Sequence, residues 1–154
     1  MKVIECPLQS NAQDFAPYSF ADCFMVETNK VINAEEAARM SLLNGPKWVG
    51  DLLKLRNLIV APLGLKTDNA VSEAPENAIG MFPIVKNTDS QIILGFDDSH
   101  LDFRIVVDVE QIENGTRIYT TTYVQTHNLL GKTYLFTIKP FHKLIVATSL
   151  RNLV

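Results

Sequence analysis

Alternating apolar and polar residues along the chain predict a protein built mainly on β-strands. Five stretches show the required period of two, at residues 18–26, 78–86, 90–97, 100–111 and 117–127. The last two flank an Asn-Gly dipeptide at 114–115, which is typical of a tight hairpin turn. The four later stretches therefore predict an antiparallel meander.

The Asn-Gly turn also predicts how the last two strands pair. With residues 114–115 as the loop, Phe103 lies opposite Thr126 and Asp102 lies opposite His127. Since the apolar side chains of the first strand must face the core, its charged ones face outward. The predicted inward positions of that strand are Phe103, Ile105, Val107 and Val109.

Three threonines share this inward face with aromatic residues. A preceding hairpin with residues 98–99 as its loop places Phe96 on the same face. Thr120, Thr122 and Thr126 lie opposite apolar residues, and each buried hydroxyl needs a hydrogen-bond partner. One interpretation is β-propensity alone. The other is a largely apolar cavity lined by hydroxyls, as in ligand pockets.

Helical signals separate the first strand from the meander. Asn33 and Glu36 form a capping-box pattern that starts a helix, and Gly45 ends it. Pro46 opens a second helix whose buried stripe is Trp48, Leu52, Leu55 and Ile59. The polar segment 66–77 is long for a connection inside a compact domain and is interpreted either as a functional flap or simply as a mobile loop.

The last 24 residues, from Gly131, predict one long helix. Pro140 removes a backbone hydrogen bond inside it, so a kink is expected there. Its predicted inward positions are Leu135, Ile138, His142, Ile145, Ser149 and Leu153. The fold class is α+β in one domain: an antiparallel curved sheet wrapped round a long kinked C-terminal helix, the helix-grip arrangement, with two short helices after the first strand.

The three histidines give the candidate chemistry. His100, Asp102 and His127 form a two-histidine, one-carboxylate set suited to a metal, but the predicted register puts them on the outer face. A solvated cross-strand pair is the alternative interpretation. His142 projects toward the interior and is the best single candidate for proton transfer, against a purely structural role. No catalytic residue is assigned, because nucleophile, P-loop and dinucleotide motifs are absent from the sequence.

Two further charged residues lie near the predicted core. Arg56 follows the buried stripe of the second helix and could place a cation at a cavity mouth, or simply extend into solvent. Asp22 lies among apolar strand residues and could pair with it. Outward-facing Tyr119 and Tyr123 leave open a third role, in which the protein contacts a partner or a second copy as a homodimer.

Composition narrows the class of protein. The chain has 154 residues, 47% of them apolar, which is enough for one core. A formal charge of −3 without a basic cluster argues against a nucleic-acid partner, and no apolar run is long enough for membrane insertion. With no signal-peptide pattern, the expected localisation is cytoplasmic. Cys6 and Cys23 lack metal-site spacing and are expected to be buried thiols.

Five segments resemble an uncharacterised bacterial family, a numbered domain of unknown function: YSFADCF (18–24), WVGDLLKLRN (48–57), LGFDDSHLDFRIVV (94–107), THNLLGKTYL (126–135) and IKPFHKLIV (138–146). The family in turn resembles the START/polyketide-cyclase (SRPBCC, Bet v 1-like) superfamily. This resemblance implies a helix-grip fold with a cavity under the C-terminal helix, where relatives hold lipids, polyketides or other apolar molecules. It implies no catalytic residues.

The expected function is therefore binding of a small, largely apolar molecule in an internal cavity, with no cofactor. A cyclase-like enzyme using His142, a metal-dependent enzyme and a protein-interaction module are the alternatives. The residues expected to line the cavity are Phe96, Phe103, Thr120, Thr122, Thr126, His142 and Arg56.

Overall fold

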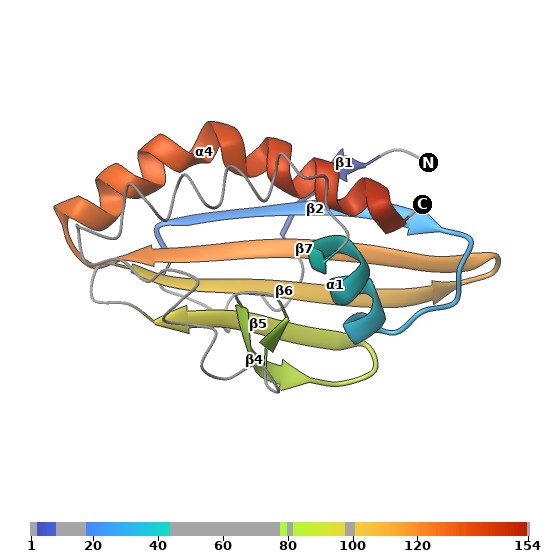
Figure 1. Cartoon of the computed structure of the whole chain (residues 1–154). Helices are drawn as coiled ribbons and strands as arrows, with labels where there is room; N and C mark the ends of the chain where they lie inside the picture. The colour runs from blue at the N-terminus through green and yellow to red at the C-terminus, as the bar shows by residue number, and fades with distance from the viewer. Residues whose placement is uncertain (1–2, 9–17, 44–77, 80–81, 98–100, 154) are drawn as a thin grey trace.

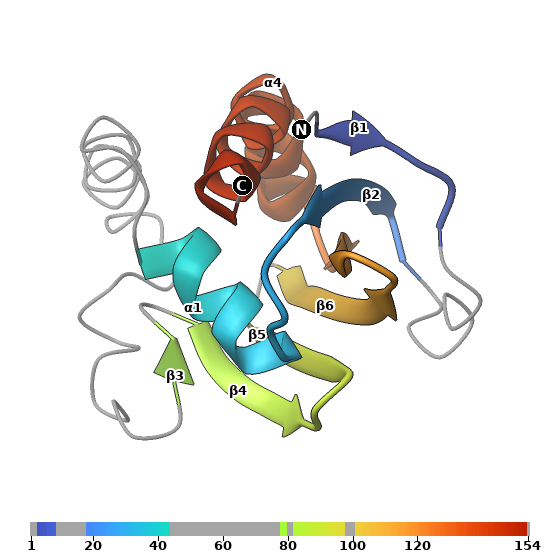
Figure 2. The ribbon, with the colours of Figure 1, turned by 90° about the vertical axis from the view of Figure 1, so that its right-hand side faces the viewer.

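The protein is an α+β structure, and the two helices among its described residues lie on one face of a curved antiparallel sheet (Figures 1 and 2). The computed structural model describes residues 3–8, 18–43, 78–79, 82–97 and 101–153. The elements in chain order are β1 (Ile4–Glu5), β2 (Phe20–Thr28), α1 (Ala34–Leu43), β3 (Ala78–Ile79), β4 (Phe82–Asn87), β5 (Gln91–Asp97), β6 (Leu101–Ile112), β7 (Gly115–Thr126), α4 (Leu129–Leu150) and the 3-10 turn η4 (Arg151–Leu153).

The strand order places the first long strand beside the last. Among the described residues the order is β1-β2-β7-β6-β5-β4-β3, and every neighbouring pair is antiparallel. The meander from β4 to β7 was predicted from the alternation of residues. The edge strand β1 was not, because two residues are too short to show a period.

The predicted register of both hairpins is wrong by two residues, although their faces are correct. Phe103 lies opposite Val124, and Asp102 lies opposite Gln125. Phe96 lies opposite Phe103. A slip of two residues keeps every side chain on its predicted face, since the period of a strand is two.

Gly115 explains the error in the last hairpin. The turn consists of residues 113–114, and Gly115 is the first residue of β7, opposite Ile112. Its φ of 148° suits glycine, and a Cβ there would lie 1.9 Å from the carbonyl oxygen of Thr28. The glycine is required by this close approach of β2, which the local sequence does not reveal.

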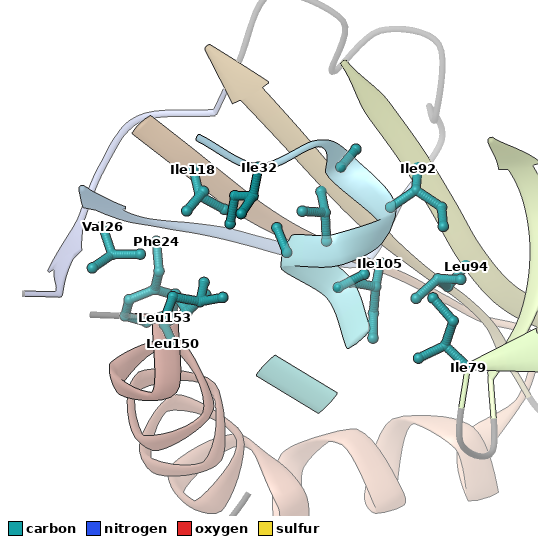
Figure 3. Packing of buried hydrophobic residues seen from close by; sticks show 14 residues of the cluster. Phe24, Val26, Ile32, Ile79, Ile92, Leu94, Ile105, Ile118, Leu150 and Leu153 are labelled. Atoms are coloured by element: carbon teal, nitrogen blue, oxygen red, sulfur yellow. The ribbon is translucent and has the colours of Figure 1, made fainter. Parts of the chain in front are cut away.

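The hydrophobic core lies between the inward face of the sheet and the two helices (Figure 3). Phe24 and Val26 from β2 meet Ile118 from β7, as expected from alternation. Leu150 and Leu153 cover them from the C-terminal end of the chain. The rest of the described cluster consists of Ile32, Ala34, Ala37, Ala38, Ile79, Ile92, Leu94, Ile105 and Val107.

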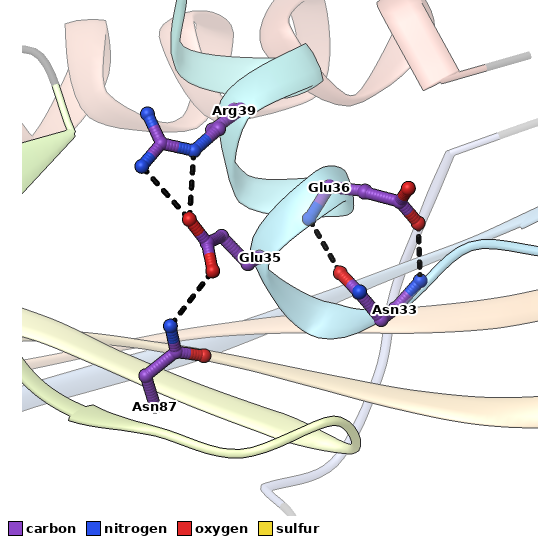
Figure 4. Close-up of polar contacts among 5 residues, drawn as sticks. All are labelled: Asn33, Glu35, Glu36, Arg39 and Asn87. Carbon is purple, nitrogen blue, oxygen red and sulfur yellow. Dashed lines mark hydrogen bonds and ion pairs between the residues drawn. The ribbon is translucent and has the colours of Figure 1, made fainter.

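The predicted capping box at the start of α1 is confirmed (Figure 4). The Glu36 backbone N–H donates to Asn33 Oδ1 at 2.8 Å, and the Asn33 N–H donates to Glu36 Oε2 at 2.9 Å. Glu35 joins the helix to the sheet, because it accepts hydrogen bonds from Arg39 of α1 and from Asn87 at the end of β4. These hydrogen bonds lower the pKa of Glu35 below its usual value, with Asn87 the largest cause.

Helix α4 begins two residues before the predicted start because Asn128 caps it. Its Oδ1 accepts the backbone N–H of Gly131 at 2.9 Å. Pro140 lies inside the helix, and the kink expected there stays a prediction. Of the predicted inward positions, Ser149 and Leu153 are buried, whereas Leu135, His142 and Ile145 are half-buried.

Several predictions fall outside the described residues. These are the second helix with Arg56, the segment 66–77, the 98–100 turn with His100, and the side chains of Phe96 and Ile138.

Candidate functional site

Asp22 and His142 meet on the inward face of the sheet. His142 Nε2 lies 3.2 Å from Asp22 Oδ1 and 3.2 Å from Oδ2. The His142 side chain is 17% exposed, and that of Asp22 only 4%. The buried carboxylate therefore holds one ring nitrogen of a histidine that solvent still reaches.

Two simple periodicities bring this pair together. Asp22 shares the inward face of β2 with Phe20 and Phe24, two residues away on either side. His142 contacts Asp22 of the sheet from α4. This helix passes over β2 and β7 (Figures 1 and 2). His142 was predicted to lie inward, but the partner suggested for Asp22 was Arg56. Among the described residues, the partner is His142.

Phe20 forms the apolar side of this site. Its ring packs edge-on against the His142 imidazole, with centroids 6.0 Å apart and an interplanar angle of 86°. The Lys139 ammonium lies 4.9 Å from the centroid of the same ring. An imidazole and an ammonium one helical turn apart thus contact one aromatic ring.

The predicted threonines lie beside this pair. Thr122 is the cross-strand neighbour of Asp22, and Thr120 is the neighbour of Phe24. Thr120 Oγ1 is buried and makes no hydrogen bond within the described structure. Asp22 Oδ2 is also buried, and within the described structure its contact is the ion pair with His142 Nε2 at 3.2 Å. Two polar atoms on one face are thus removed from water without a complete set of partners.

Thr126 has a structural role instead. Its hydroxyl lies 3.1 Å from the Ser19 hydroxyl, which also accepts the Thr126 backbone N–H at 3.1 Å. This pair joins the start of β2 to the end of β7. Phe103 is partly buried against the core cluster, on the inward face that Asp22 and Thr122 share.

The outward pair of Asp102 and His127 forms as predicted, but diagonally. His127 Nε2 lies 2.9 Å from Asp102 Oδ1, and the two side chains are 39% and 34% exposed. Within the described ranges, no group of three His, Cys, Asp or Glu side chains could hold a metal ion. The third residue of the predicted triad, His100, lies outside those ranges.

One of the two tyrosines proposed to contact a partner is not available. Tyr123 is 3% exposed and packs against Tyr18, with ring centroids 5.3 Å apart. The proposal assumed that outward strand positions are solvated, but this part of the outer face is covered. Thr121 and Val106, its neighbours on that face, are also buried.

Comparison with known proteins shows the family. A family model described as "Protein of unknown function (DUF2867)" matches residues 15–149. The chain belongs to this family. The match spans both members of the Asp22–His142 pair and the whole meander. No curated protein and no solved structure matches the chain.

Of the helices that the structure describes, none is both long and apolar enough to cross a membrane.

Proposed function

We propose that the inward face of the sheet beneath α4 binds a small, largely apolar molecule and that the Asp22–His142 pair is its polar contact. The observation that carries the proposal is a buried hydroxyl without a hydrogen bond in the described structure, Thr120 Oγ1, close to a buried carboxylate whose Oδ2 has only the His142 contact. A buried polar group without a partner costs about 1–3 kcal/mol. A bound molecule with one or two polar atoms would offset that cost.

The surroundings of the pair support an apolar ligand. Phe20, Val124 and Phe103 lie on the inward face around Asp22 and Thr122, so the polar atoms are set in an apolar wall. Such walls with a few oriented polar groups characterise small-molecule sites. Fold analogy is consistent with this: the first long strand lies beside the last, and a C-terminal helix lies over that seam, as the helix-grip arrangement of START-like proteins requires. The analogy supports the fold of the site and not an activity.

A thermal-shift series with defined probes tests the proposal. Suitable probes are a medium-chain fatty acid, a naphthol and a saturated hydrocarbon alcohol, each added to the intact protein. Probes that occupy the face raise the melting temperature of the wild type. The matched variant is Thr120→Val, which keeps the shape but removes the hydroxyl, and it should reduce the shift for polar probes. A melting temperature that no probe raises would remove the basis of the proposal.

A second function is favoured by the geometry of the pair itself. When the Nε2–H of His142 donates to Asp22, Nδ1 is an acceptor, so the carboxylate fixes the tautomer of a general base. We therefore propose proton transfer on a bound ligand as the alternative to simple binding. Turnover that is lost in His142→Gln, while ligand affinity and folding remain, would favour the enzyme.

A further inference from the structure

The thiol of Cys6, just after β1, contacts the thiol of Cys23 in β2 at the edge of the sheet. Cys6 Sγ lies 3.1 Å from Cys23 Sγ, and both cysteines are present as thiols. The register of β1 on β2 pairs Ile4 with Met25 and Glu5 with Phe24, so its next step places Cys6 directly opposite Cys23. The Cys6 N–H donates to the Cys23 carbonyl oxygen at 2.9 Å, which extends the strand pairing to this position.

This arrangement meets the geometric needs of a disulfide bond. Directly opposed residues of a hydrogen-bonded antiparallel pair have Cα atoms about 5.5 Å apart. Disulfides form between Cα atoms roughly 4.4–6.8 Å apart. The backbone therefore needs no rearrangement, and only rotation of the two side chains brings the sulfurs to bonding distance.

We propose that Cys6 and Cys23 are a site of reversible disulfide formation that fastens the N-terminal strand to the sheet. The two thiols differ in access: Cys6 is half-buried, whereas Cys23 is fully buried and accepts a hydrogen bond from the Thr121 hydroxyl at 3.3 Å. Cys6 is accordingly the thiol that an outside reagent reaches, and Cys23 is the resolving thiol.

The oxidant is a small-molecule disulfide. The Cys6 thiol loses its proton to solvent, attacks one sulfur of the reagent and releases the first small thiolate, leaving a mixed disulfide. Cys23 then loses its proton, attacks Cys6 Sγ and releases the second thiolate. The two released thiolates take up two protons. In total, two protein thiols are oxidised and one reagent disulfide is reduced to two thiols.

The rate of this exchange depends on pH. Burial, with smaller contributions from the neighbouring Cys23 and from Glu5, raises the pKa of the Cys6 thiol to about 12. The thiolate is the attacking species. At pH values below that pKa, the initial rate should therefore increase about tenfold for each unit by which the pH is raised.

Oxidation would act on more than the strand edge. Glu5 of β1 forms an ion pair with Lys143 of α4, at 3.2 Å, and Lys143 is adjacent to His142. Fixing β1 to β2 therefore also fixes one contact of the helix that carries His142. The disulfide itself does not depend on the proposed function of that site.

The experiment incubates the full-length protein with oxidised glutathione at mildly alkaline pH and follows its intact mass. The expected product has lost two hydrogens, and proteolysis without reductant yields one peptide pair joined through Cys6 and Cys23. Its melting temperature should rise by about 6–12 °C, as expected for a closed loop of this length in a domain of this size, and dithiothreitol should reverse the change.

Two matched variants separate the roles of the thiols. Cys23→Ser should accumulate the mixed glutathione disulfide on Cys6, and Cys6→Ser should remain unmodified. If the buried serine impairs folding, Cys23→Ala replaces it. A stable mixed disulfide on the wild type, a linkage between two chains, or an unchanged mass after incubation at several pH values would overturn the proposal.

Discussion

The imidazole of His142 and the carboxylate of Asp22 lie 3.2 Å apart, although 120 residues separate them in the chain. The contact joins α4 to β2 on the inward face of the sheet. The carboxylate is nearly buried, whereas the imidazole retains a path to solvent. A buried acid with one partner and an accessible ring is the most chemically distinctive arrangement in the described structure.

Breaking this contact from either side should destabilise the protein non-additively. His142→Gln removes the imidazole that contacts the buried carboxylate, at a cost of about 1–3 kcal/mol in the free energy of unfolding. Once Asp22→Asn has removed the charge, the histidine substitution should cost less. Urea denaturation of both single variants and the double variant measures this coupling, expected at about 1 kcal/mol. Purely additive effects would show that the two groups do not interact in solution.

Gly115→Ala should be among the most damaging single substitutions in the protein. The new Cβ would lie 1.9 Å from the Thr28 carbonyl oxygen, so β2 or β7 must move. We expect a loss of more than about 2 kcal/mol. Asn114→Ala is the matched control, because Asn114 is exposed and no non-glycine residue in the described structure has a positive φ. A large cost for Asn114→Ala with a small one for Gly115→Ala would favour the register with both residues in the loop.

Asp108 should make stability depend on pH. Burial raises the pKa of its carboxyl above the usual 3.8, against the opposing hydrogen bond from Gln91 and the charge of Lys86. The folded chain therefore holds this proton more tightly than the unfolded chain, so the contribution of Asp108 to stability falls as pH rises from 3.8 through the folded pKa. Asp108→Asn should therefore gain stability relative to wild type as the pH rises above 3.8. A stability difference between the two proteins that does not change with pH above 3.8 would contradict this.

Patterns of residues close together in the sequence predicted the helices, the strands and the inward face of the sheet. The strand register depended on contacts between residues far apart in the sequence. The capping box of Asn33 and Glu36 depends on residues three apart, so the sequence alone identified it. The inward face of β6 and β7 was predicted correctly although the register was wrong by two residues, because side chains alternate between faces with a period of two. The position of Gly115 relative to the turn depended on Thr28, a contact far away in sequence.

In the candidate site, too, local patterns predicted where each residue lies but not which residues meet. His142 could be placed inward by helical spacing, and Asp22 by alternation with Phe20 and Phe24. Their pairing required knowing that α4 lies over β2, which no local pattern specifies. Cys6 and Cys23 are a second case, since the two-residue strand that aligns them gives no periodic signal.

Methyl NMR during titration of the intact protein with a medium-chain fatty acid tests the central claim most directly. The account predicts shifts clustered on the inward face around the Asp22–His142 pair, at Val124 and Ile105 of the sheet and Ile145 of α4. The shifts should weaken in Thr120→Val and His142→Gln. Shifts confined to exposed methyl groups, such as Leu129 and Leu144 on the solvent side of α4, would contradict it.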